Sequence, residues 1–195
     1  ALESELSSES AEQAAIARAQ GLTILFRDDA RYERRLDNLA SRDLLVDALL
    51  GTGAEGETRG AIREAIQAIN RSGVPVLSID VPSGVHTDTG EELGESVWAL
   101  RTVVLGMPKP FLFQGIGIEH SGYWDVREIG LPPALTEEPT RAKMTDPEWV
   151  GSLLPERLRS AHKGDSGSVV IVAGSRRMRG AAVIAARAAI RSGAG

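Results

Sequence analysis

Residues 43–60 read "DLLVDALLGTGAEGETRG", an apolar run followed by a loop with four glycines in ten positions. The near-continuous apolar run at 43–50 predicts a strand covered on both faces of a parallel sheet. Apolar residues then recur at helical spacing through "AIREAIQAINRSG" (61–73), which predicts a helix that ends at Gly73. The stretch as a whole predicts a strand–loop–helix unit of an α/β protein.

The same alternation continues on both sides of this unit. Further strands are predicted at "LTILF" (22–26), "VPVLSI" (74–79), "RTVVLG" (101–106) and "GYWDVREIG" (122–130). Two helical stretches are predicted at 3–20 and 28–40, one on each side of the strand at 22–26. Alternating strands and helices favour a parallel sheet layered between helices.

A second unit is predicted near the C-terminus. Residues 131–150 are rich in Pro, Thr and charge, which is typical of a linker. "SVVIVAGS" (168–175) and "AAVIAARAAIRSG" (181–193) then form another strand–loop–helix pattern. The expected organisation is a domain, a linker and the start of a second domain, at residues 1–135, 136–159 and 160–195.

Composition narrows the class of protein. With 42% hydrophobic and 25% charged residues, the chain resembles an ordinary soluble globular protein, and the absence of cysteine excludes disulfides and thiolate metal sites. We therefore expect a cytoplasmic location. The net charge is −5 with scattered basic residues, and no apolar run reaches membrane-spanning length. We expect a small-molecule partner, with no nucleic acid and no membrane.

Two acids follow predicted strands, where open parallel sheets bind ligands. Asp47 lies near the end of 43–50 and Asp80 closes 74–79, so both carboxylates face one crevice if these strands are neighbours. The loop 51–57, "GTGAEGE", leaves the same edge and leads into a helix whose first N–H groups favour anions. Its spacing is neither a Walker loop nor the dinucleotide fingerprint. An anion-binding loop and a tight turn both remain open.

The turn "DVPSG" (80–84) adds a hydroxyl to the acid. Pro82 fixes the backbone, Ser83 presents its hydroxyl and Gly84 allows an unusual dihedral angle. Such a turn can ligate a hard cation through oxygen or position a proton, or it can simply cap local backbone. In "GMPKP" (106–110), a stiffly held lysine faces either an anion or solvent.

Other chemistry has less support. The three histidines, His86, His120 and His162, lie far apart and show no metal-ligand spacing. Asp and Ser occur without a histidine partner, which disfavours a hydrolase triad. "GSRRMRGAA" (174–182) is either a second anion-binding loop or a solvated charged loop.

Several of these motifs, in this order, resemble one family. "DALLGTGAEGE", "VPVLSIDVPSGVHTDTG", "VVLGMPKP" and "GYWDVREIGLP" resemble the second half of the epimerase domain in bacterial bifunctional enzymes that repair hydrated NADH and NADPH. Residues 153–195 resemble the opening of the ADP- or ATP-dependent dehydratase domain of the same enzymes. The resemblance covers nearly everything from about residue 43 onward.

The resemblance implies a fold and an activity. The fold is a Rossmann-like parallel sheet between helices, followed by the start of a ribokinase-like α/β domain. The activities are epimerisation of R- and S-NAD(P)HX and dehydration of S-NAD(P)HX to NAD(P)H. Potassium, ADP or ATP, and NAD(P)HX as substrate are the implied ligands, and a homo-oligomer is a possible state because the family's epimerase domain commonly dimerises.

It also implies roles for particular residues. Asp47 and Ser83 match potassium ligands, and Asp80 matches a substrate-contacting, catalytic acid. Ala181 matches a position that contacts the hydrated cofactor in the dehydratase half. The implied substrate loop consists of Gly51, Thr52, Gly53, Ala54, Glu55, Gly56 and Glu57.

One departure separates this chain from the family pattern. The family's Asn-Asn-Gly-Gly-Asp-Gly loop is absent, and so is the rest of the dehydratase with its nucleotide loop and catalytic Asp. We therefore expect an internal segment that is inactive by itself. Two alternatives stay open: a catalytically silent nucleotide-binding or interaction module, and the start of a ribokinase-like small-molecule kinase.

Overall fold

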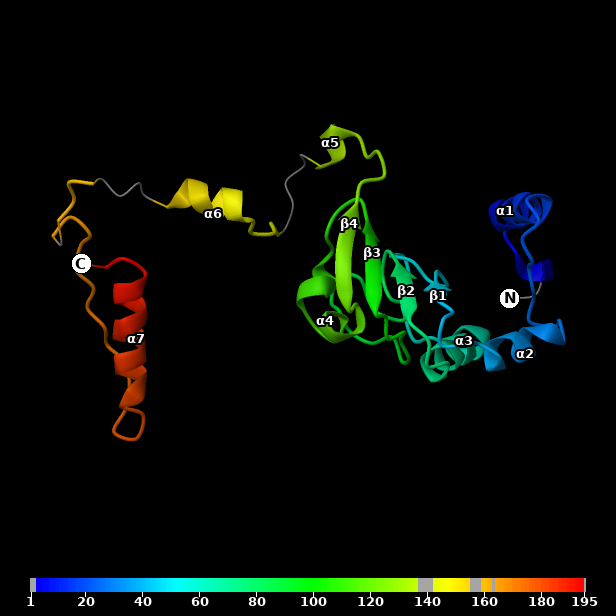
Figure 1. The fold of residues 1–195 in the computed structure, drawn as a ribbon, viewed down its shortest axis with the longest axis horizontal. Coiled ribbons are helices and arrows are strands. Elements are labelled where there is room, and N and C mark those ends of the chain that lie inside the picture. Colours follow the sequence, from blue (N-terminus) through cyan, green and yellow to red (C-terminus); the bar gives the residue numbers. More distant parts are fainter. Residues whose placement is uncertain (1–2, 137–141, 155–158, 163, 195) are drawn as a thin grey trace. The chain divides into compact units, whose positions relative to one another are not determined.

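The computed structural model describes residues 3–136, 142–154, 159–162 and 164–194. These fall into two compact units, Ala1–Arg141 and Ala142–Gly195. The first unit contains a parallel sheet with its helices, and the described part of the second contains helices and loops (Figure 1).

The sheet of the first unit has four parallel strands in the order β1-β2-β3-β4. Their bounds are Leu45–Asp47, Val76–Ile79, Arg101–Leu105 and Tyr123–Arg127. In register, Asp47 lies opposite Ser78 and Ile79 lies opposite Val103. The predicted parallel α/β fold is therefore confirmed, and the strands that carry Asp47 and Asp80 are neighbours.

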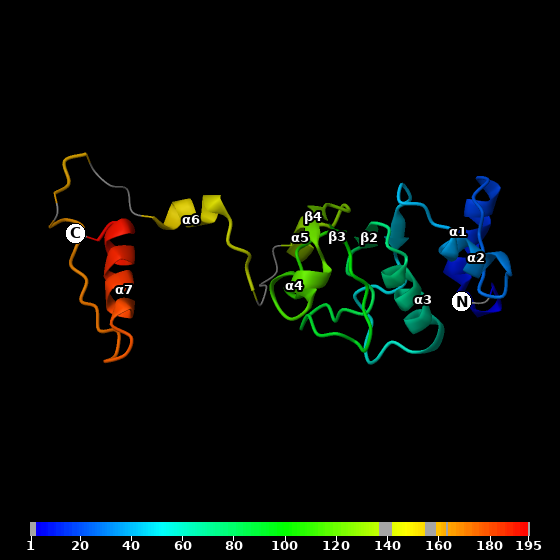
Figure 2. The ribbon, with the colours of Figure 1, turned by 60° about the horizontal axis from the view of Figure 1, so that its bottom comes forward.

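Short helices accompany the strands. In the first unit they are η1 (Glu3–Glu5), α1 (Ser8–Ala19), α2 (Arg31–Asp37), α3 (Gly60–Arg71), η2 (Pro110–Phe113), α4 (Gly117–His120) and α5 (Pro133–Thr136). In the second unit they are α6 (Pro147–Leu153) and α7 (Gly180–Arg191). Figure 2 shows α3 beside the sheet from a second direction.

Helix α3 forms where the sequence pattern predicts it. Its apolar stripe buries Ile66 and Ile69 against Val76 of β2. Complete burial of a side chain such as that of Ile66 stabilises the fold by about 1.5–3 kcal/mol. The helix ends at Arg71, and Gly73 follows with φ +70°, the left-handed conformation that commonly ends helices.

A second apolar cluster lies at β3 and β4. Val104 of β3 is fully buried against Phe111 and Leu112 of η2 and against Val81, which follows β2. The partly buried Trp124 of β4 packs on the same cluster. The two clusters fix the positions of β2 and β3, and the predicted site residues Asp80 and Ser83 follow β2.

The strand predicted at 43–50 is shorter and less covered than expected. Only residues 45–47 pair with β2, and the side chain of Val46 is 55% exposed. β1 is an edge strand of this sheet and pairs on one side only among the described residues, and the face that carries Val46 is left partly exposed.

Two other predicted strands are wrong. Residues 22–26 and 168–175 form no strand, although both are apolar. A strand needs a neighbour to satisfy its backbone groups, and neither segment has a paired partner among the described residues. Consequently Val170 and Val172 are 88% and 96% exposed.

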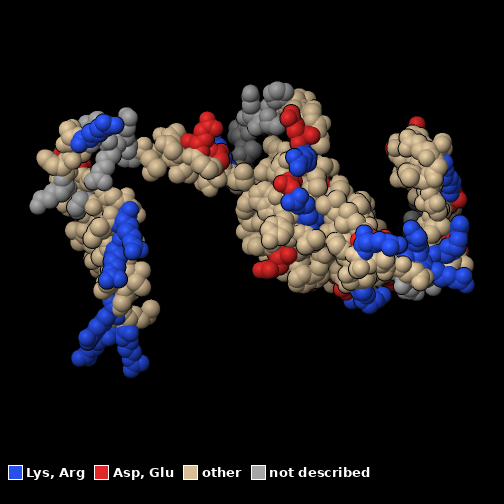
Figure 3. All heavy atoms as spheres, in the orientation of Figure 1, with Lys and Arg blue, Asp and Glu red and all other residues tan. Residues whose placement is uncertain are grey.

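Charged side chains are distributed differently in the two units. Figure 3 shows acidic and basic side chains interspersed around β4, whereas those along α7 are basic. Within the described ranges no helix is both long and apolar enough to span a membrane.

Candidate functional site

Asp47, at the end of β1, is a buried carboxylate. Its side chain is 1% exposed. Oδ2 accepts hydrogen bonds from the Ser78 hydroxyl at 2.7 Å and from the Ser83 backbone N–H at 2.9 Å. Oδ1 accepts a hydrogen bond from the Ser83 hydroxyl at 2.5 Å. Ser78 of β2 and Ser83 of the turn that follows it therefore hold Asp47 in one orientation.

Ser83 joins β1 to the turn after β2. Its hydroxyl donates to Asp47 and accepts from the backbone N–H of Leu50 at 2.9 Å. Ser83 is fully buried, and its carbonyl accepts from the N–H of Val97. The structure thus brings together the two residues predicted as cation ligands, although they are 36 positions apart.

The surroundings of Asp47 and Ser83 fit a cation in one respect, which is that the buried carboxylate has no counter-charge among the described residues. Burying a carboxylate is costly unless a counter-charge or hydrogen bonds compensate for the lost water. Asp47 has hydrogen bonds, but it takes part in no ion pair with the described residues. In the described ranges there is no cluster of three His, Cys, Asp or Glu side chains placed to hold a metal. The two predicted ligands, Asp47 and Ser83, would by themselves leave the coordination shell of a cation incomplete.

Asp80, directly after β2, has a strained backbone. Its φ of +71° makes it the one non-glycine residue with positive φ in the described part of the chain. The N–H of Val81 donates to the carbonyl of Ile79 across it, which closes a γ-turn of the rare positive-φ form. Such strain costs about 1–3 kcal/mol and persists where the surrounding structure enforces it, often at functional sites.

The Asp80 carboxylate forms an ion pair with Lys109. Nζ of Lys109 lies 2.5 Å from Oδ1 of Asp80 and also donates to the carbonyl of Leu105 at 2.9 Å. The backbone N–H of Leu105 donates to the same Oδ1 at 3.0 Å. Both charged side chains are 19% exposed. Lys109 therefore faces an anion, the carboxylate of Asp80, rather than solvent.

The glycine loop 51–57 is exposed, apart from the half-buried Ala54. A Cβ atom added at Gly51, Gly53 or Gly56 would meet no atom within 4 Å, and only Gly56 has positive φ. Neither packing nor backbone conformation therefore requires glycine at positions 51 and 53 in this structure.

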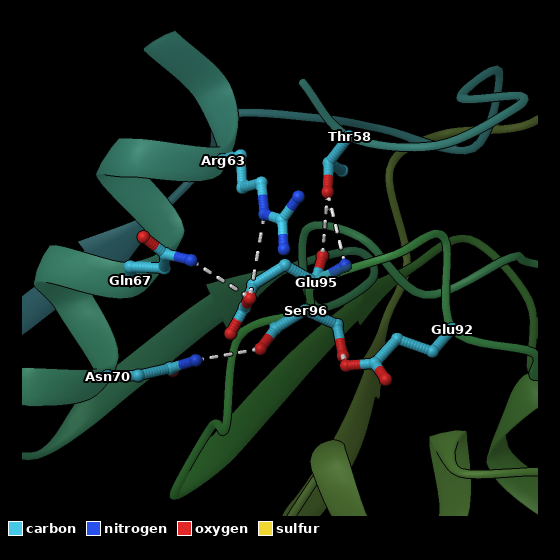
Figure 4. A network of polar contacts seen from close by, with 7 residues as sticks. All are labelled: Thr58, Arg63, Gln67, Asn70, Glu92, Glu95 and Ser96. Atoms are coloured by element: carbon cyan, nitrogen blue, oxygen red, sulfur yellow. Dashed lines mark hydrogen bonds and ion pairs between the residues drawn. The ribbon is translucent and has the colours of Figure 1, made fainter. Parts of the chain in front are cut away.

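The far end of the loop is anchored to the segment 92–96. The Thr58 N–H donates to the carbonyl of Leu93 at 2.6 Å, and its hydroxyl exchanges two hydrogen bonds with the backbone of Glu95. Figure 4 shows how the side chain of Glu95 also contacts Arg63 and Gln67 of α3. The loop thus leaves a fixed base, while residues 51–57 project from it.

Beside this anchor lies a buried polar pair that the sequence patterns did not predict. The Ser96 hydroxyl donates to Glu92 and contacts Nδ1 of His120, each at 2.8 Å. Because Ser96 has a single hydroxyl proton, Nδ1 of His120 must donate to it. Burial lowers the pKa of His120 below its ordinary value of 6.5, against weaker opposite effects of Glu92 and Glu119. This pair fastens the segment before β3 to α4.

The predicted site residues are divided between the two units. Ala181 is in the first turn of α7, in the second unit, whereas Asp47, Asp80 and Ser83 belong to the first unit. A cavity of about 680 Å³ in the first unit is lined by residues outside the predicted site. Its lining residues are Thr23, Leu25, Arg31, Tyr32, Arg34, Arg35 and Asn38.

A parallel sheet with acids, a buried hydroxyl and a glycine loop at its carboxyl edge defines a Rossmann-like α/β protein. Residues 1–111 match the family described as "YjeF-related protein N-terminus". The chain belongs to this family.

Relatives of known description agree with this assignment. The chain is 40% identical over 175 residues to the "Bifunctional NAD(P)H-hydrate repair enzyme Nnr" of Thermofilum pendens, an alignment that covers 90% of this chain and 33% of that protein. The protein of the same name from Coxiella burnetii is 42% identical over 158 residues, which cover 78% of this chain and 32% of the relative. The predicted resemblance is confirmed, and the chain spans about a third of the length of these relatives.

A solved structure is also similar. The crystal structure of yeast ynu0, YNL200c, has a TM-score of 0.48 and 21% sequence identity, covering 55% of this chain and 44% of that one.

Proposed function

We propose that the first unit provides the site at which the R and S epimers of hydrated NADH and NADPH are interconverted. The observation that carries this proposal is Asp80: a strained, oriented carboxylate at the carboxyl end of a parallel strand, in a chain of this family. Epimerisation needs a group that exchanges protons near C6 of the hydrated ring, and Asp80 is the acid placed to do so. It is the proposed catalytic residue.

The glycine loop is the proposed nucleotide-binding element. Gly51, Thr52, Gly53, Ala54, Glu55, Gly56 and Glu57 form this loop. Packing does not require its glycines at positions 51 and 53. We propose that they allow the pyrophosphate to approach the backbone N–H groups closely.

Asp47 and Ser83 are the proposed ligands of a potassium ion. Asp47 supplies a buried negative charge without a side-chain counter-ion among the described residues, and Ser83 supplies a neutral oxygen beside it. A bound cation would neutralise the carboxylate and fix the turn that carries Asp80.

The second unit is proposed as the opening of an ADP- or ATP-dependent dehydratase domain, which removes water from the S epimer. The similarity to the T. pendens enzyme extends over 175 residues and therefore past residue 111. In this proposal residues 1–135 belong to the epimerase domain, 136–159 to a linker and 160–195 to the dehydratase, where Ala181 contacts the hydrated cofactor.

The test is an assay of the gene product at its native length, meaning the length that its own gene encodes. The proposal predicts that a mixture enriched in R-NADPHX equilibrates faster with this protein than without it. It also predicts that ADP-ribose shifts the amide NMR signals of residues 51–57. Equilibration at the uncatalysed rate would refute the enzymatic function. If ADP-ribose nevertheless binds, the chain would be a catalytically silent nucleotide-binding module.

A further inference from the structure

Lys109 is a largely buried lysine that pairs with Asp80 and lies outside the residues assigned above. We propose that it is a positioning residue for Asp80: it holds Oδ1 of the carboxylate so that Oδ2 is presented to the ligand. This inference rests on the proposed function of Asp80 and adds a residue to it.

The two oxygens of Asp80 have different surroundings. Oδ1 accepts hydrogen bonds from Nζ of Lys109 and from the Leu105 N–H. Oδ2 accepts none from the residues that the structure describes. With the Asp80 side chain 19% exposed, Oδ2 is the oxygen left to meet a small molecule at the strand end. A carboxylate fixed through one oxygen transfers protons through the other.

The position of Lys109 is itself well defined. It lies between Pro108 and Pro110, and its backbone is extended (φ −119°, ψ 153°), as expected before a proline. Its Nζ donates to the carbonyl of Leu105 as well as to Asp80, so two acceptors hold the ammonium group. A lysine fixed in this way loses little further freedom when the ligand binds.

The strained backbone conformation of Asp80 explains why its side chain contacts Lys109. With φ at +71°, Asp80 projects its side chain from the γ-turn toward the residues that follow β3 rather than along its own strand. Leu105 contributes one hydrogen bond through its backbone, which no substitution at position 105 other than proline removes. Among the described residues Lys109 contributes the one side-chain hydrogen bond and the one opposite charge at Asp80, so the orientation of the carboxylate depends on it.

The first test measures turnover in the native-length gene product with Lys109→Met and Lys109→Arg. We expect Lys109→Met to lower kcat for NADPHX epimerisation by about 10²-fold or more, within the range of a lost acid–base contribution. KM should change less than threefold, because Lys109 acts through Asp80 and not on the nucleotide. Lys109→Arg keeps the charge and should recover at least tenfold of the loss. Lys143→Met, which removes a lysine from the second unit, is the matched control and should leave kcat unchanged.

The second test does not depend on turnover. Three-bond couplings of the Asp80 Cγ atom report its side-chain rotamer in labelled protein. We expect one rotamer in the wild type and averaging between rotamers in Lys109→Met, with amide exchange in β2 and β3 unchanged. If the wild type lacks epimerase activity, the proposed function fails and the couplings alone decide the role of Lys109. A single unchanged Asp80 rotamer in Lys109→Met, or a loss of kcat below threefold, would overturn the inference.

Discussion

The Ser83 hydroxyl donates a 2.5 Å hydrogen bond to Oδ1 of Asp47, and both residues are buried. This contact joins the end of β1 to the turn that follows β2, so the two strand ends cannot separate without exposing it. It also places a neutral oxygen next to a buried negative charge. Stability and cation binding should therefore depend on the same pair.

Asp47→Asn should destabilise the sheet unit and abolish any preference for potassium. The amide group would turn an NH₂ toward one of the donors that now face the carboxylate, which costs about 1–3 kcal/mol. Urea denaturation in KCl and in tetramethylammonium chloride at equal ionic strength measures both effects. The wild type should be more stable in KCl, because a ligand that binds the folded state stabilises it.

The exposed Asp88 is the matched control, and Asp88→Asn should change the free energy of unfolding by less than about 0.5 kcal/mol. Equal stability of the wild type in the two salts would refute the cation assignment and leave Asp47 with a structural role.

Gly53→Ala should separate nucleotide binding from stability. A Cβ at position 53 meets nothing within 4 Å, so the fold should be unaffected or stabilised by about 0.4–1 kcal/mol. If the pyrophosphate approaches this backbone, the same methyl group should weaken ADP-ribose binding about tenfold or more in a calorimetric titration. Gly151→Ala, at an equally open position in α6, is the control and should bind as the wild type does.

Gly84→Ala should behave in the opposite way. Its Cβ would lie 2.0 Å from the Glu95 carbonyl oxygen, at φ +91°, so the variant should lose stability.

If Gly53→Ala binds ADP-ribose with wild-type affinity, the loop is a tight turn and not a ligand loop.

His120 should make stability depend on pH. Burial lowers its pKa below 6.5, so between that value and the lower folded-state pKa the unfolded chain binds a proton that the folded chain does not. The contribution of His120 to the free energy of unfolding should therefore be complete above pH 6.5 and should be lost as the pH falls below that value. Denaturation at pH 7.5 and pH 5.5 should show a smaller decrease in His120→Gln than in the wild type. His162→Gln, at an exposed histidine, should match the wild type; an equal decrease in all three would exclude His120 as the cause.

Amide hydrogen exchange should distinguish the two units. Beyond about residue 150, apolar side chains such as those of Val172 and Ile184 are exposed, and the described residues include no sheet. In the 195-residue chain these amides should exchange much faster than those of β1 and β2. Uniform protection in both regions would contradict this and indicate that the second unit has a protected core.

The sequence patterns predicted the sheet well for a physical reason. Apolar runs such as 74–79 and 101–106 correspond to strands that lie inside the sheet, and the apolar stripe of 61–73 corresponds to a helix face buried on it. The runs at 22–26 and 168–175 have the same composition but form no strand. Composition specifies what a strand can bury, whereas pairing depends on a neighbouring strand that a local pattern does not contain.

The candidate site shows the same division. Asp47, Ser83 and Asp80 could be predicted because strand ends and the rigid turn 80–84 mark them in the sequence. The contact between Asp80 and Lys109 spans 29 positions and depends on the register of β2 with β3, which no spacing rule provides. The available signal was a lysine held between two prolines just after the strand that neighbours the one ending at Asp80.

The most direct test of the account is the turnover of Asp80→Asn in the native-length gene product. Asparagine tolerates positive φ and still offers an oxygen to Leu105 and Lys109, so the variant should fold and bind ADP-ribose within about threefold of the wild type. It cannot act as an acid or base. We predict that the rate of NADPHX epimerisation falls by about 10²–10⁴-fold. A loss of less than about threefold would contradict the catalytic role of Asp80 and assign it to structure.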